Sequence, residues 1–78
     1  MPDYNVIIAS DPDHEKVFAE LRYGDKVIAC VSQENGPDRL NVELPGPGLV
    51  EAYVLREIPL DDFICLLESG ARKLLEQE

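Results

Sequence analysis

Apolar and polar residues alternate along two neighbouring segments in the first half of the chain. The alternation runs from Lys16 to Tyr23 and returns from Lys26 to Gln33. A period of two is typical of strands that bury one face. Gly24 and Asp25 separate the segments, and glycine tolerates the positive φ that a two-residue hairpin requires. We therefore predict a β-hairpin whose first strand turns Val17, Ala19, Leu21 and Tyr23 to one face, and whose second strand turns Val27, Ala29 and Val31 together.

Further strands are predicted on both sides of this hairpin. Residues Asp3–Ala9 are rich in β-branched side chains and end at a cluster of turn formers. Residues Arg39–Leu44 alternate again, with Leu40, Val42 and Leu44 expected inward. The prolines of Pro45–Gly48 lack amide donors and interrupt any ladder. The pattern also allows a fifth strand over Ala52–Ile58, with apolar residues on both faces.

The last twenty residues change to the period of an amphipathic helix. Pro59 suits the entry, Asp61 and Asp62 fall in the first turn, and basic residues follow near the end, as the helix dipole favours. Gly70 is costly inside a helix, so we expect it to mark a close approach to the sheet. The apolar positions that define the stripe are Leu60, Phe63, Ile64, Leu67, Ala71, Leu74 and Leu75.

This order of elements predicts the fold class. Strands followed by one helix, without βαβ alternation, indicate an α+β domain. We expect residues 1–78 to form one domain, with an antiparallel four- or five-stranded meander and a C-terminal amphipathic helix packed on one face. At 78 residues, the chain is too short for a second core, and a 45% hydrophobic content is sufficient for one.

Charge and the absence of targeting patterns restrict the partners. Seven Lys and Arg against sixteen Asp and Glu give a net charge of −9, which argues against direct binding of nucleic acid. The apolar run Val6–Ala9 is too short for a secretory signal or a membrane span. We therefore expect a cytoplasmic protein that binds neither nucleic acid nor membrane directly.

Residue chemistry gives no enzyme motif. The cluster Asp11–Glu15 holds the only histidine, His14, and a metal site there is weighed against a turn in which Asp side chains bond nearby amides. The turn is favoured because a second histidine is missing. Cys30 and Cys65 are expected to be free thiols, without a CxxC partner. We predict no catalytic residue, cofactor or metal, and therefore not an enzyme.

The acidic excess is the most informative remaining feature. It suits either a solvated surface or docking to a basic protein, where complementary fields accelerate association. Carboxylates can also occupy a nuclease cleft where phosphates would lie. Phe18 and Leu55 are candidate apolar anchors of such an interface, provided that the helix does not cover the faces on which they lie. The candidate partner-binding residues are Asp11, Asp13, Glu15, Glu34, Asp38, Glu43, Tyr53 and Glu57.

Three stretches carry a family resemblance: Tyr4–Pro12, Val27–Gly36 and Arg56–Phe63. With them, the chain resembles small immunity proteins of bacterial contact-dependent growth inhibition systems in length, acidity and sheet-then-helix order. The resemblance implies a cytoplasmic antitoxin that binds the C-terminal domain of its cognate toxin, which is often a nuclease. It implies inhibition by occlusion, so no catalytic residue is carried over. The alternative is a small acidic regulatory module without a toxin partner, or a weak homo-oligomer joined through a strand edge or the free sheet face.

Overall fold

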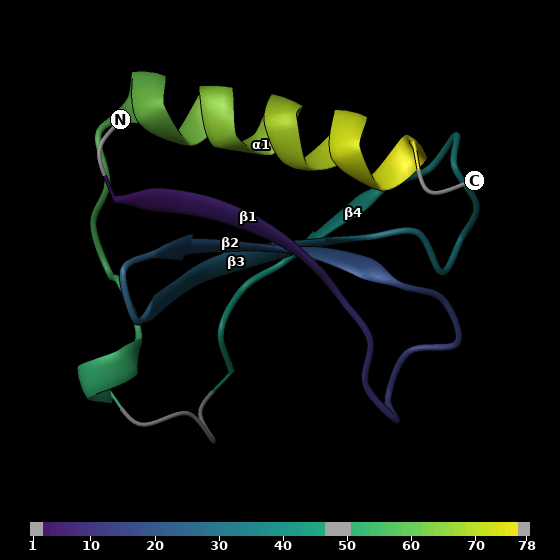
Figure 1. Cartoon of the computed structure of the whole chain (residues 1–78), viewed down its shortest axis with the longest axis horizontal. Helices are drawn as coiled ribbons and strands as arrows, with labels where there is room; N and C mark the ends of the chain where they lie inside the picture. The colour runs from purple at the N-terminus through teal and green to yellow at the C-terminus, as the bar shows by residue number, and fades with distance from the viewer. Residues whose placement is uncertain (1–2, 47–50, 77–78) are drawn as a thin grey trace.

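Four antiparallel strands form one sheet, and a single helix lies across one of its faces (Figure 1). The computed structural model describes residues 3–46 and 51–76. The strands follow one another in space in the order β1-β2-β3-β4, which is a meander. The predicted α+β class is therefore confirmed in its four-stranded form. The elements are β1 (Tyr4–Ala9), β2 (Phe18–Tyr23), β3 (Lys26–Ser32), β4 (Asn41–Glu43) and α1 (Leu60–Leu75).

The β2–β3 hairpin turns at the predicted place but contains an irregularity in its register. Gly24 has a φ of +59°, as its turn position requires. Leu21 faces Ala29 across the ladder, whereas Arg22 faces Val27, so Ile28 is an extra residue on β3. This bulge reverses the alternation. Val27 therefore lies on the helix-free face with Arg22, and the prediction that it shares a face with Ala29 and Val31 was wrong.

The core forms where the middle of the sheet meets α1. Gly70 is buried there, and a Cβ added to it would lie 2.9 Å from Cδ2 of Leu21. The close approach predicted at this glycine is confirmed, and it brings the line Leu66, Gly70 and Leu74 against the sheet. Leu66, absent from the predicted stripe, is buried, while Leu60, Ile64 and Leu75 are exposed. The buried residues of the core are Ala19, Leu21, Ile28, Ala29, Val31, Leu66 and Leu74.

One helix is too narrow to cover four strands. A helix with its side chains is about 10–12 Å wide, and strands are spaced about 4.8 Å apart. α1 packs over β1, β2 and β3 and does not reach β4. Val42, predicted inward, is consequently 48% exposed, and Leu40 packs against the core. Leu44, also predicted inward, lies beyond the end of β4 and is 71% exposed.

The predicted fifth strand is absent from the described residues. Its place is taken by a 3₁₀ helix, η1 (Glu51–Tyr53), and by one isolated bridge from Val54 to Val27. The Leu55 amide donates to the Val27 carbonyl oxygen at 2.9 Å. Val54 is buried, and Leu55 is half-buried and packs against the core, so this segment is covered although it joins the sheet at one bridge only. The second half of the predicted loop, 47–48, lies outside the described residues.

Side chains of β1 and α1 fix the helix to the sheet. The Tyr4 hydroxyl donates to Oδ2 of Asp62 at 3.0 Å, in the first helical turn. Near the other end, Nζ of Lys73 donates to the Val6 carbonyl oxygen at 3.2 Å.

Among residues 3–46 and 51–76, no helix has the length and apolar character that a membrane crossing demands.

Candidate functional site

A hollow of about 370 Å³ lies on the helix-free face of the sheet and is rich in carboxylates. Side chains of β2 and β3 that alternate away from α1 form its floor, and the loop after β1 and the end of β4 form its walls. Its lining residues are Asp11, Asp13, His14, Phe18, Glu20, Val27, Cys30, Glu43, Leu44, Pro45 and Gly46. We call this feature the acidic hollow.

His14 joins two walls of the acidic hollow. Its Nδ1 lies 2.7 Å from Oδ1 of Asp11, and its Nε2 lies 3.0 Å from Oε2 of Glu43 on β4. The ring also lies on Phe18, with 4.5 Å between ring centroids. The two hydrogen-bonded carboxylates, Asp11 foremost, raise the pKa of His14 to about 9. At neutral pH the side chain is therefore an imidazolium between two carboxylates.

The Asp11 turn has the geometry predicted for it. The Asp13 amide donates to Oδ1 of Asp11 at 3.0 Å, and the His14 amide donates to the Asp11 carbonyl oxygen at 3.2 Å. The hydrogen bond to His14 and these amide contacts hold the pKa of Asp11 below its usual range. Asp11 thus fixes the turn and leaves the exposed carboxylate of Asp13 at the wall of the hollow.

Glu34 has a structural role that its sequence position does not reveal. Its two carboxylate oxygens accept hydrogen bonds from the amides of Glu15 and Lys16, at 2.8 and 2.9 Å. These bonds lower the pKa of Glu34. The neighbouring Gln33 is buried and donates from Nε2 to the Val17 carbonyl oxygen at 3.0 Å. Together, the two side chains fasten the loop after β1 to the end of β3.

The remaining polar groups of the hollow are also held in place. Arg22 donates to Oε1 of Glu20 at 2.7 Å and to the Asp25 carbonyl oxygen at 3.0 Å. The Ser32 hydroxyl and His14 lower the pKa of Glu43. Burial, with the nearby carboxylates, raises the pKa of the Cys30 thiol to about 11, so this thiol is protonated and a poor nucleophile. Cys30 and Cys65 are free, as predicted.

The structure brings together only part of the predicted partner-binding set. Asp11, Asp13 and Glu43 line the acidic hollow. Glu15, Glu34 and Asp38 lie in the loops at the same end of the sheet, outside the hollow lining. Tyr53 is the last residue of η1, which lies at the opposite end of the sheet (Figure 1). Glu57 lines a separate hollow, which it shares with Leu44.

Two apolar anchors do not escape burial, and two polar residues were missed. Phe18 does lie on the face free of the helix, but His14 covers it and leaves it only 5% exposed. Leu55 packs against the core. His14 and Glu20 belong to the site although the sequence reading did not include them among the partner-binding residues. His14 stands in the densest polar cluster, which was a usable signal, whereas its contact with Glu43 spans 29 positions.

The hollow has the chemistry of a cation-binding surface. Within residues 3–46 and 51–76, no group of three or more His, Cys, Asp or Glu side chains has an arrangement that could hold a metal ion. The carboxylates of Asp13, Glu20 and Glu43 instead border a wide space floored by apolar groups. Such a space fits the stem and charged head of a Lys or Arg side chain.

Comparisons of the chain with protein-family models, with curated proteins and with solved structures find no match. The function is therefore inferred from the charge, shape and hydrogen bonds of this surface.

Proposed function

We propose that this chain is an immunity protein of a contact-dependent growth inhibition system. In this proposal it binds the C-terminal domain of its cognate toxin and blocks the active site or substrate-binding surface. The observation that carries the proposal is the acidic hollow, where carboxylates from three separate segments of the chain border one apolar-floored space. A net charge of −9 adds a long-range field of the same sign.

A basic toxin surface is the complement that this hollow requires. Nucleases bind phosphates with Lys and Arg, and a carboxylate placed in the same position satisfies those side chains without being cleaved. The single imidazolium of the hollow is already outnumbered by the two carboxylates that it contacts, Asp11 and Glu43. The carboxylates of Asp13 and Glu20 therefore leave the hollow with a negative excess, although Arg22 reduces it at Glu20.

The hollow also supplies the apolar contact that a stable interface needs. Leu44 stands at its rim with 71% of its surface exposed. In protein interfaces, affinity comes from a few desolvated anchors, while surrounding charges govern the association rate and the choice of partner. In this interface Leu44 is the apolar anchor, and the surrounding carboxylates determine which partner binds.

Co-expression tests this function and the surface that performs it. The chain is produced in cells together with the polypeptide encoded directly upstream, which is the expected toxin, and survival is measured. Asp13→Lys reverses a charge in the hollow, and Glu76→Lys makes the same change at the C-terminal end of α1, outside the hollow. We expect the wild-type chain and Glu76→Lys to protect cells, and Asp13→Lys to protect them poorly. Continued killing with the wild-type chain would sink the proposal.

A further inference from the structure

β4 is an edge strand whose outer side is open among the described residues. The sheet order places it last, next to β3 alone. In an antiparallel pair only alternate residues bond to the neighbour, so an edge strand directs its other amide and carbonyl groups outward. The opposite edge differs, because Lys73 of α1 contacts the backbone of β1 at Val6. A lysine at a strand edge discourages further pairing. In the part of the chain that the structure describes, α1 does not reach β4.

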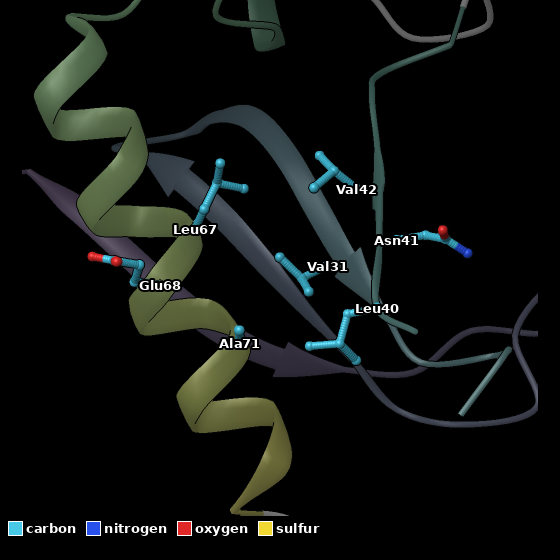
Figure 2. A pocket seen from close by; sticks show the side chains of 7 residues that line it. All are labelled: Val31, Leu40, Asn41, Val42, Leu67, Glu68 and Ala71. Carbon is cyan, nitrogen blue, oxygen red and sulfur yellow. The ribbon is translucent and has the colours of Figure 1, made fainter. Parts of the chain in front are cut away.

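Two hollows of opposite character flank this edge. On the helix face, an apolar groove of about 260 Å³ lies between α1 and β4, where Val31, Leu40, Val42 and Leu67 meet (Figure 2). On the other face, Glu43 of the same strand lines the acidic hollow. Val42 and Glu43 point to opposite faces because side chains alternate along a strand. Asn41 also points away from α1 (Figure 2).

We infer that β4 pairs with an extended segment of a basic protein partner, and that this segment alternates apolar residues with Lys or Arg. A strand added beside β4 directs alternate side chains to the two faces of the sheet. One set enters the apolar groove, and the other set reaches the carboxylates of the acidic hollow. Backbone hydrogen bonds between the two strands supply affinity. The apolar groove and the acidic hollow supply specificity, because each accepts one set of the alternating side chains. The inference rests on the proposed function and specifies how the toxin domain is held.

Charge selects this occupant over a second copy of the chain. Each copy carries a net charge of −9, and a β4–β4 pair would bring the acidic hollows of both copies to one interface. Like charges placed close together at an interface disfavour association. A cationic segment is attracted by the same carboxylates.

Two variants with the same change of charge test the pairing. Val42→Lys places a cation at the mouth of the apolar groove, where it opposes an incoming apolar side chain. Leu60→Lys makes the same change at an exposed apolar residue of α1 outside the groove. Both positions are exposed, so we expect both variants to fold, and circular dichroism verifies this. The probe is the purified toxin domain encoded directly upstream, titrated calorimetrically, with hydrogen exchange of the bound and free chain.

The expected result is a loss of affinity of roughly tenfold or more for Val42→Lys, against less than about threefold for Leu60→Lys. The amides among Asn41–Glu43 that face away from β3 gain protection from exchange when the toxin domain binds. Equal affinities with unprotected β4 amides would overturn the inference and leave the proposed function standing. No binding by the wild-type chain would overturn both. A dimer of the free chain that Val42→Lys dissociates would assign the edge to a second copy and also overturn the inference.

Discussion

At the scale of single residues, His14 determines the shape of the acidic hollow. It connects a turn that follows β1 to the edge strand β4, because Asp11 and Glu43 each accept a hydrogen bond from one of its ring nitrogens. Without this imidazolium, two carboxylates would face each other across the hollow. His14 is therefore best understood as the residue that holds the carboxylates in place rather than as a ligand for a metal.

Stability should consequently fall as His14 loses its proton. Its pKa is raised from 6.5 to about 9 in the folded chain, so its contribution is fully present below pH 6.5 and is lost as the pH rises through about 9. We expect His14→Gln to melt several degrees below wild type at pH 6, and the two melting temperatures to converge by pH 10. Thermal denaturation across this range measures the difference. A gap that is independent of pH would contradict the ionic bridge.

Glu34 gives a second prediction at this scale. Glu34→Ala removes both acceptors for the Glu15 and Lys16 amides, so these amides should exchange with solvent roughly tenfold faster while the sheet amides stay protected. Hydrogen exchange followed by NMR measures each amide separately. Asp38→Ala, in the same loop region, is the control and should leave both rates unchanged. Unaltered exchange in Glu34→Ala would show that the loop is held in another way.

At the scale of elements, the fit between α1 and the sheet is set by Gly70. A side chain there would enter space occupied by the buried Leu21, with Val31 and Ala19 close behind. Gly70→Val should therefore lower the free energy of unfolding by about 2 kcal/mol, the usual cost of overpacking. Glu68→Val, exposed on the same helix, should cost less than about 1 kcal/mol, the helix-propensity loss alone. Denaturant titration separates the two, and equal losses would contradict the close approach.

The elements also show how far the sequence predicts the structure. Strands β2, β3 and β4 and the helix follow from periods of two and 3.6 residues, since each buries one side against the core. Strand β1 follows from its β-branched residues and the turn formers after it. The bulge at Ile28 breaks the period of two. It lies in the apolar run Val27–Val31, where every residue is compatible with burial, so the sequence pattern does not show where the bulge is. The apolar residues of Ala52–Ile58 suggested a strand, but burial against the core needs no ladder. The His14–Glu43 contact joins distant residues and has no local signal.

At the scale of the whole molecule, one helix on a four-stranded sheet leaves two surfaces at the same edge. The helix stops short of β4 and leaves an apolar groove on one face. The turn after β1 places carboxylates on the other face. Edge, groove and acidic hollow form one continuous surface along β4, which suits a partner that is both apolar and basic.

The central claim is that this surface binds a cationic protein, and its association rate measures that claim most directly. The purified chain is mixed with the toxin domain encoded directly upstream, and the association rate constant is recorded between about 0.05 and 0.5 M salt. Over this range the distance at which salt screens a charge falls from roughly 14 Å to 4 Å. We predict a one-to-one complex whose association slows by about tenfold or more over this range. Absence of a complex, or a rate that does not depend on salt, would contradict the account.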